Sequence, residues 1–185
     1  MDQKALIRSV AEDERKMVDS MCAMLRFPAV GPESGGKGES EKAPFLLGLL
    51  KELGFEDIQV LESPDPRVPS GKRPNIIATV KGSTRRRTWV IAHMDVVPEG
   101  DPSAWKYPPF QGTVVDGKVY GRGAEDNGQE LLASLFGLHA LVKNGITPET
   151  DVGLVFVADE EQGNTHGIDF LLAKDIFRNG DIVVV

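Results

Sequence analysis

Three short acidic segments of this chain each stand where a predicted strand or turn ends. They are Ala92-His93-Met94-Asp95, Gly123-Ala124-Glu125-Asp126-Asn127 and Asp159-Glu160-Glu161. An imidazole and several carboxylates are the ligands that borderline and hard divalent cations prefer, and two such ions can activate water for attack on an amide. The three segments therefore predict part of a two-metal hydrolase site.

The first segment follows an apolar stretch at 88–92 that predicts a central strand. Because side chains alternate across a strand, His93 and Asp95 emerge on the same face, at the end where open α/β sheets bind ligands. His93 would bind a metal through one ring nitrogen while Asp95 holds the other. Taken alone, a His-x-Asp pair favours the alternative of a hydrogen-bonded histidine at a strand end.

The second segment carries glycines that permit a tight turn into a helix, with Asp126 at the helix start. One alternative is that Asp126 only caps the helix. A dinucleotide-binding loop is a second alternative, but its glycine spacing differs from 121–128. Glu125 and Asp126 would also repel the pyrophosphate that such a loop binds.

The third segment follows a strongly apolar stretch at 152–158. Three successive carboxylates at a buried edge repel one another unless cations neutralise them or some stay protonated. On an exposed loop they would only promote solubility. The metal site is favoured because all three segments end on one side of one predicted sheet.

The apolar spacing predicts the elements that position these segments. One amphipathic helix is expected over 6–25, then a mobile loop over 31–42 and a helix that opens at Pro44 and closes at Gly54. Further helices are expected over 131–142 and 164–174. Strands are expected at 58–61, 75–80, 88–92, 152–158 and 181–185, the last of them buried.

The alternation of strands and helices predicts an α/β fold: a largely parallel mixed sheet with helices on both faces. The strands at 75–80 and 88–92 are predicted to be neighbours in a hairpin, because only a short arginine-containing turn separates them.

The composition is that of one globular domain, with 185 residues, 41% of them hydrophobic and 26% charged. The net charge of -7 argues against a nucleic-acid surface, which needs clustered Lys and Arg. The run Arg85-Arg86-Arg87 predicts a solvated turn, with phosphate binding as the weaker alternative. Cys22 is the only cysteine, which excludes an internal disulfide and favours a reduced, buried thiol.

Residues 1–8 lack the continuous apolar run of a signal peptide, and no segment has the length and apolarity of a transmembrane helix. We therefore expect a cytoplasmic protein that binds neither membranes nor nucleic acids.

Four ordered blocks resemble the two-zinc amidohydrolase and exopeptidase family, peptidase family M20. This family includes acetylornithine deacetylase, succinyl-diaminopimelate desuccinylase, aminoacylase, glutamate carboxypeptidase and many dipeptidases. The resemblance covers nearly the whole chain. The blocks are Ala92-His93-Met94-Asp95-Val96-Val97-Pro98, then Trp105 through Pro108-Pro109-Phe110, then Asp116-Gly117-Lys118-Val119-Tyr120-Gly121-Arg122-Gly123 with Asp126, and finally Asp159-Glu160-Glu161-Gln162-Gly163.

The resemblance implies a pair of divalent metal ions, zinc first, with cobalt or manganese as alternatives. His93 would bind one ion, Asp126 would bridge both and Glu161 would bind the other. Glu160 would be the general base, and Asp95 would hold His93 in place. The peptide bond after Asp126 would be cis.

The sequence departs from the family pattern at Asn127, where many members have Met before a Lys. We interpret this departure as a subfamily feature that leaves the metal assignment unchanged. His139, on the apolar side of a helix, and His166, near a helix start, lack ligand spacing to the three segments.

Roughly tetrahedral ions need more ligands than His93, Asp126 and Glu161 supply. The resemblance places a further Asp just after the strand ending at Val185, and a further His near the carboxyl terminus of a complete enzyme, beyond a dimerising lid domain. We therefore interpret residues 1–185 as the amino-terminal portion of a metallopeptidase catalytic domain, truncated and inactive by itself, from a protein that would be a homodimer when complete.

The function implied is hydrolysis of an amide bond in an N-acyl amino acid or a small peptide. Deacetylase, desuccinylase, dipeptidase and carboxypeptidase types all remain open. The competing hypothesis is a non-catalytic fragment or subunit that keeps the fold for binding or assembly.

Overall fold

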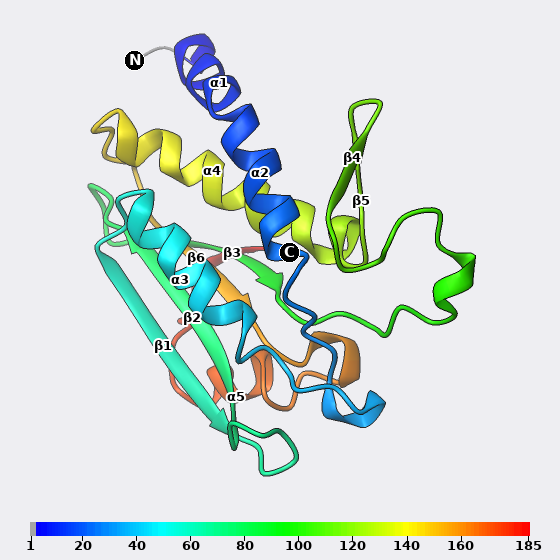
Figure 1. Ribbon diagram of the computed structural model, residues 1–185. Coiled ribbons are helices and arrows are strands. Elements are labelled where there is room, and N and C mark those ends of the chain that lie inside the picture. The colour runs from blue at the N-terminus through cyan, green and yellow to red at the C-terminus, as the bar shows by residue number, and fades with distance from the viewer. Residues whose placement is uncertain (1–2) are drawn as a thin grey trace.

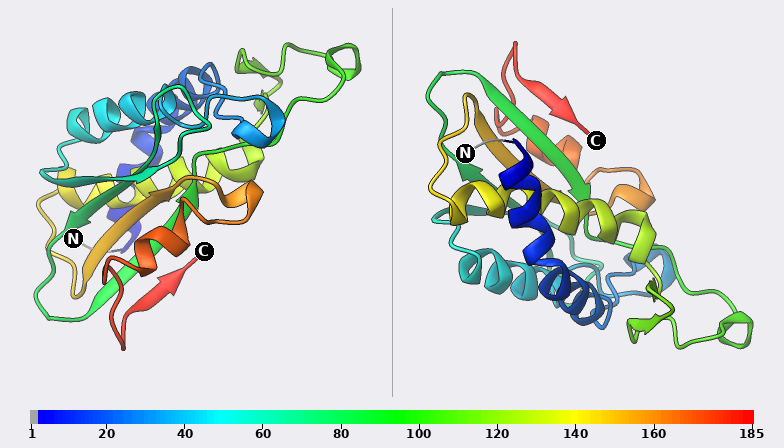
Figure 2. Two further views of the ribbon diagram at one scale, coloured as in Figure 1. Left: turned by 90° about the horizontal axis from the view of Figure 1, so that it is seen from below. Right: turned by 90° about the horizontal axis from the view of Figure 1, so that it is seen from above.

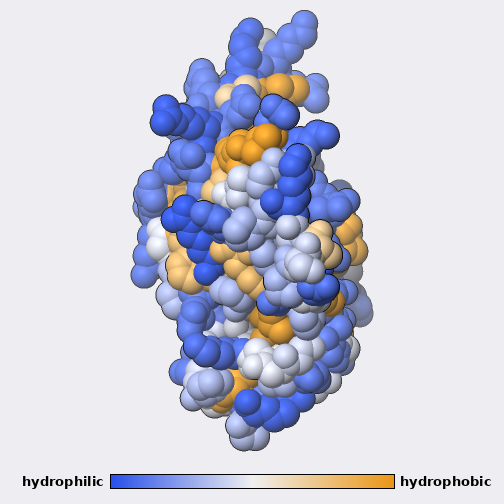
Figure 3. Space-filling model, turned by 45° about the vertical axis from the view of Figure 1, so that its right-hand side comes forward, coloured by the Kyte–Doolittle hydropathy of each residue, from blue (hydrophilic) through white to orange (hydrophobic). Residues whose placement is uncertain are grey.

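The computed structural model describes residues 3–185 and contains one mixed sheet with helices on both of its faces (Figure 1). The first two residues of the amino-terminal segment analysed above lie outside the described residues. No helix within residues 3–185 is long and apolar enough to cross a membrane. On the face shown in Figure 3, apolar side chains form small patches between hydrophilic ones.

The sheet has five strands in the order β1-β2-β6-β3-β7. The strands β1 and β2 are antiparallel, as are β2 and β6, whereas β3 is parallel to both β6 and β7. The sheet is therefore mixed, as predicted. The strands are β1 (Asp57–Pro64), β2 (Lys72–Val80), β3 (Arg87–His93), β6 (Asp151–Val157) and β7 (Ile182–Val184), and a separate small hairpin pairs β4 (Thr113–Val115) with β5 (Lys118–Tyr120).

The predicted hairpin between β2 and β3 is wrong, because β6 lies between these two strands. The turn that joins β2 to β3 bonds to the segment before β6 instead of closing on itself. The N–H groups of Ser83 and Thr84 donate to the carbonyls of Pro148 and Glu149, at 3.0 and 2.9 Å. With β6 inserted, β6 lies at the sheet centre between β2 and β3, where both faces are covered.

The helices α1 (Gln3–Glu12), α2 (Glu14–Met24), α3 (Lys42–Glu52) and α4 (Glu130–Lys143) lie on one face of the sheet, and α5 (Ile168–Leu172) lies on the other (Figure 2). The helix predicted over 6–25 is divided at Asp13, whose carboxylate pairs with Lys143 of α4 at 3.1 Å. The helix predicted over 164–174 begins later than expected, because Asn164 has a φ of 67° and Gly167, just before α5, is not helical at φ −103° and ψ −112°.

Two apolar clusters fix the sheet between these layers. The larger one packs α2, α3 and α4 against one sheet face and includes Leu46, Leu135 and Phe156, each fully buried. The smaller one, on the α5 side, contains Ile77, Trp89, Val155, Val157 and Leu171. Because apolar surface is buried on both faces of the sheet, the sequences of β6 and β3 are nearly continuous runs of apolar residues.

Several charged or terminal segments differ from the sequence prediction. The loop predicted over 31–42 contains a short 3-10 helix, Pro32–Ser34, and its Glu39 and Lys42 are buried. Arg87 is not solvated, because its guanidinium donates two hydrogen bonds to Asp181, at 3.0 and 2.7 Å.

The last strand, β7, is about half exposed rather than buried, because it lies at the sheet edge and pairs only with β3. Cys22 is free and half-buried on α2 rather than fully buried.

Candidate metal centre

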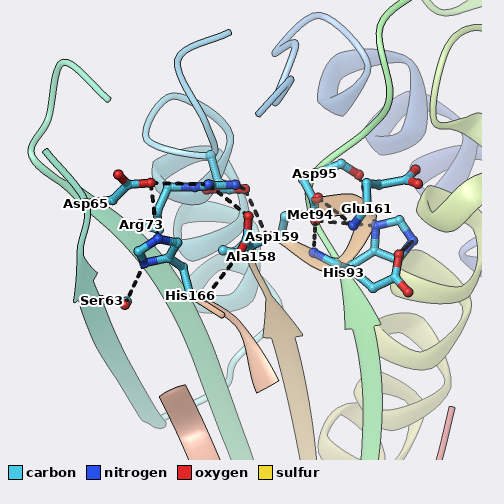
Figure 4. Close-up of polar contacts among 12 residues, drawn as sticks. Ser63, Asp65, Arg73, His93, Met94, Asp95, Ala158, Asp159, Glu161 and His166 are labelled. Carbon is cyan, nitrogen blue, oxygen red and sulfur yellow. Dashed lines mark hydrogen bonds and ion pairs between the residues drawn. The ribbon is translucent and has the colours of Figure 1, made fainter. Parts of the chain in front are cut away.

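The sheet brings two of the acidic segments together at one edge. Strands β3 and β6 are parallel neighbours, and their last pair is His93 opposite Val157. The segments that follow each strand therefore leave the sheet side by side, which places Asp95 beside the 3-10 turn Glu160–Gln162. Figure 4 shows His93, Asp95 and Glu161 converging at this edge.

His93 is buried, and its two ring nitrogens face different partners. Nδ1 lies 3.0 Å from the backbone carbonyl oxygen of Asp95 and 3.6 Å from its carboxylate. Because a carbonyl only accepts hydrogen bonds, Nδ1 carries a proton. Nε2 lies 2.9 Å from Oδ1 of Asp126. The ring is thus oriented mainly by the backbone carbonyl of Asp95, and Nε2 points at the carboxylate predicted to bridge the ions.

Protons compete for Nε2 of His93. Burial lowers the pKa of His93, but the hydrogen bonds that the ring donates to Asp95 and Asp126, together with the charge of Asp95, outweigh burial and raise the pKa to about 9. A cation at Nε2 would take the place of this proton, because a metal-binding imidazole nitrogen must be unprotonated.

Asp126 reaches this site from the turn that precedes α4. Gly123, with a φ of 80°, starts the segment Ala124–Gln129, and Asp126 itself is non-helical at φ −102° and ψ 98°. The Asp126–Asn127 peptide bond is cis, which confirms that prediction. The side chain is 71% exposed, so it is open to a ligand or substrate from solution.

Glu161 completes a group of three potential ligands. One atom each from His93, Asp126 and Glu161 lies within 4.8 Å of the others. Partial burial and the charges of Asp126, Asp95 and Glu160 raise the pKa of Glu161, while His93 opposes them. A carboxylate crowded by other carboxylates gains from a cation in their midst.

Asp95 has a role beyond the predicted one. Its carboxylate is 1% exposed and accepts hydrogen bonds from the N–H groups of Glu160 and Glu161, both at 3.0 Å. Burial raises the pKa of Asp95, but the hydrogen bonds from His93, Glu161 and Glu160 lower it below its usual value. Asp95 therefore remains ionised and joins the residue that orients His93 to the turn that carries Glu161.

Glu160 stands at the wall of a cavity of about 390 Å³. Its Oε2 lies 3.8 Å from Nε2 of His93, and its side chain is 46% exposed. His93, Asp126 and Asn127 line the same cavity, and Ile91, Val157 and Ile168 provide an apolar side. A larger cavity between α2 and α3 lies away from these residues and carries none of the predicted chemistry.

Asp159 is separated from the other acidic residues of its segment. It is 2% exposed, and its carboxylate lies 3.2 Å from Nη1 of Arg73. The left-handed backbone at Asp159, with a φ of 64°, turns its side chain away from Glu160 and Glu161. The three carboxylates therefore do not share one site, and an arginine neutralises the first.

Sequence reasoning missed two polar residues that hold the site. Asn127 accepts a hydrogen bond from the N–H of His93 at 3.1 Å and donates one to Glu130. Lys42 donates to the carbonyl of Met94 at 2.6 Å, and burial, opposed by Asp95 and Glu39, lowers its pKa to about 8. The departure at Asn127 was the only sequence signal for either residue.

The other two histidines lie outside this centre. Nδ1 of His139 faces the carbonyl of Leu53 at 2.8 Å. Nε2 of His166 accepts a hydrogen bond from Nη2 of Arg67 at 3.0 Å, because a guanidinium only donates. The ring proton is therefore on Nδ1, which donates a hydrogen bond to the hydroxyl of Ser63, also at 3.0 Å.

Comparison with known proteins decides the family. The sequence model of peptidase family M20/M25/M40 matches residues 89–184, which include all five predicted site residues. The chain belongs to this family. An uncharacterized metallohydrolase of Methanocaldococcus jannaschii is 35% identical over 169 residues, and a succinyl-diaminopimelate desuccinylase of Delftia acidovorans is 32% identical over 146 residues.

Solved structures share the fold. An M20 family metallo-carboxypeptidase from Sulfolobus solfataricus matches with a TM-score of 0.71 at 25% identity, over 85% of this chain and 34% of that one. A di-peptidase from Saccharomyces cerevisiae matches with a TM-score of 0.78 at 22% identity, over 92% of this chain and 37% of that one.

The match covers only part of the relatives. The chain aligns over 88% of its own length with the M. jannaschii protein but over 41% of that protein, and over 78% of its length with 36% of the D. acidovorans desuccinylase. The chain thus spans about two fifths of the length of these relatives.

Proposed function

We propose that the protein containing this chain hydrolyses an amide bond in an N-acyl amino acid or a small peptide, with divalent metal ions bound at His93, Asp126 and Glu161. The observation that carries the proposal is the approach of these three side chains within 4.8 Å, from three segments far apart in the sequence. Membership of a peptidase family supports the reaction type.

The donor set fits a borderline divalent cation. One imidazole nitrogen and two carboxylates suit zinc, and cobalt or manganese accept the same ligands. The hydrogen bond between Nε2 of His93 and Oδ1 of Asp126 holds these two atoms 2.9 Å apart, and both could bind a metal once Nε2 has lost its proton. When bound, such ions would polarise the amide carbonyl and lower the pKa of water.

The residues of this chain would have different roles in the reaction. Glu160, half exposed at the cavity wall, would take a proton from the attacking water and return it to the leaving amine. Asp95 would orient His93 through its backbone carbonyl and would hold the turn bearing Glu161 through its carboxylate. The apolar side of the cavity, at Ile91, Val157 and Ile168, would exclude water from part of the substrate.

Two ions need more ligands than these three residues supply. The relatives extend well beyond the aligned segment, which supports the proposal that further ligands lie outside residues 1–185. We therefore propose that this segment is the amino-terminal portion of a catalytic domain. By itself it would bind metal weakly and turn over no substrate. The complete protein would be a cytoplasmic homodimer.

The test uses the full-length protein with a panel of N-acetyl and N-succinyl amino acids and dipeptides, after metal analysis. Glu160→Ala should abolish turnover while metal content stays near that of the wild type. Glu125→Ala is the matched control, because Glu125 is an exposed carboxylate on the neighbouring turn. Equal activity of both variants, or a metal-loaded protein that cleaves nothing in the panel, would favour the non-catalytic alternative.

A further inference from the structure

The turn that carries Glu160 and Glu161 is held from two sides. On one side, the carboxylate of Asp95 accepts hydrogen bonds from the backbone N–H groups of Glu160 and Glu161. On the other side lies Asp159, the residue that starts the turn. Its carboxylate accepts hydrogen bonds from Nη1 of Arg73 at 3.2 Å and from the N–H of His166 at 3.0 Å, as Figure 4 shows.

Arg73 is fully buried in β2, and a second carboxylate fixes its orientation. Its Nε and Nη2 donate to the two carboxylate oxygens of Glu39, at 2.6 and 2.5 Å. A bidentate pair of this kind fixes the plane of the guanidinium. Nη1 is thereby left pointing at Asp159 and at Asp65, 3.5 Å away.

Glu39 also contacts the turn directly. Its Oε1 accepts the N–H of Asp159 at 3.4 Å, and the side chain is 0% exposed. Asp159 has a φ of 64°, a conformation that residues other than glycine adopt rarely and that surrounding contacts must hold. Both the backbone and the side chain of Asp159 are thus fixed by the Glu39–Arg73 pair.

We propose that Glu39 and Arg73 form a buried clamp that positions the turn from Asp159 to Glu161, and so sets where the Glu161 carboxylate lies relative to His93 and Asp126. The role of Glu161 rests on the proposed function, whereas the clamp is a property of the fold. Both residues are positioning residues, because they are buried behind the turn and line no part of the cavity.

The alternative is a buried ion pair that affects only global stability. Buried pairs often contribute little net stability compared with apolar residues, so stability alone does not account for such a pair. The two readings differ in where a substitution acts. A clamp variant loosens the turn, whereas a variant of a purely structural pair changes the whole molecule.

The experiment compares Arg73→Lys with Arg87→Lys in the full-length protein. Arg87 is a matched control, since it makes a bidentate pair with Asp181 in the same sheet, at the opposite end of β3 from His93. A lysine cannot reproduce a bidentate pair in either place. Amide hydrogen exchange at Glu160, Glu161 and His166 is measured in metal-free protein, and the dissociation constant for Zn²⁺ by titration, at a temperature where both variants are folded.

Arg73→Lys should speed exchange of these three amides and weaken Zn²⁺ binding, each by about tenfold or more. It should lower kcat more than it changes KM. Arg87→Lys should leave exchange at the turn and Zn²⁺ affinity as in the wild type. Equal effects of the two variants, or no effect of Arg73→Lys at the turn, would overturn the clamp.

Asp159→Asn keeps the test decisive if Arg73→Lys does not fold. This variant leaves the Glu39–Arg73 pair intact, but an amide presents only one acceptor oxygen in place of the two that bind Arg73 and His166. The same faster exchange and weaker Zn²⁺ binding are expected, and wild-type values would refute the proposal. If the wild-type protein binds no metal, the proposed function fails while the exchange data still decide the clamp.

Discussion

The carboxylate of Asp95 accepts the backbone N–H of Glu161 at 3.0 Å, although 66 positions separate the two residues in the sequence. Asp95 follows β3 and Glu161 follows β6, so this contact joins the ends of two parallel central strands. The backbone carbonyl of Asp95 also faces Nδ1 of His93. A single buried residue therefore sets the relative position of two of the three predicted metal ligands.

Asp95→Asn should weaken metal binding by about 10- to 100-fold, the usual effect of losing a partner that orients a ligand. The amide keeps one acceptor oxygen, so at least one of the N–H groups of Glu160 and Glu161 loses its partner. Competition with a chromophoric chelator measures the affinity. Asp101→Asn is the control, because Asp101 is exposed and only caps a short turn through the N–H of Ser103. Similar affinities for both variants would argue against this role of Asp95.

Asn127→Ala should lower the free energy of unfolding by about 1 to 3 kcal/mol, because the N–H of His93 would lose its acceptor at the end of a buried strand. Urea denaturation of the metal-free protein measures the change. Gln59→Ala, at an exposed position of β1, should change stability by no more than about 0.5 kcal/mol. A loss at Asn127 no larger than the loss at Gln59 would contradict the bonding role of Asn127.

The candidate ligands could be predicted from the sequence, because their placement at strand and turn ends follows local rules. The alternation of side chains places His93 at the end of a central strand, and glycines before Asp126 predict its turn. Strand pairing is set by distant contacts, so the insertion of β6 between β2 and β3 was not visible in a local pattern.

Burial of charged residues depends on distant contacts in the same way. Glu39 and Lys42 look like surface residues in a polar loop, and only their partners Arg73 and Met94 explain their burial. The sequence also did not show that the side chain of Asp159 points away from that of Glu160. Asp159 has a left-handed backbone conformation, which changes the side-chain direction expected from the strand pattern.

Gly153→Ala should destabilise the protein by about 1 to 3 kcal/mol, as overpacking of a core does. A Cβ at Gly153 would lie 2.2 Å from the ring of Trp89, a β3 residue buried in the apolar cluster on the α5 side of the sheet. Gly137→Ala is the matched substitution in α4, where a Cβ would meet nothing within 4 Å. It should stabilise the helix by about 0.5 to 1 kcal/mol. Thermal unfolding of both variants tests this packing, and effects of the same sign would contradict it.

Asp181 should make stability depend on pH in the acid range. Burial raises its pKa, but hydrogen bonds from Trp89, the N–H of Arg178 and Arg87 outweigh burial and lower it below the usual value. A lowered folded-state pKa stabilises the protein above the unfolded-state pKa of about 4, and this contribution is lost as pH falls through the folded-state value.

The midpoint of thermal unfolding should therefore fall more steeply below about pH 4 in the wild type than in Asp181→Asn. Above that pH the wild type should be the more stable of the two. Parallel acid profiles for both proteins would show that Asp181 has no special part in acid sensitivity.

The most direct measurement of the central claim is an anomalous difference map from crystals of the full-length protein grown with zinc, recorded at the zinc edge. The proposed metal centre predicts a peak about 2.0 to 2.2 Å from Nε2 of His93 or from the carboxylates of Asp126 and Glu161, with Asp126 shared between two peaks. A catalytically active, metal-loaded protein whose peaks lie away from these three side chains would contradict it.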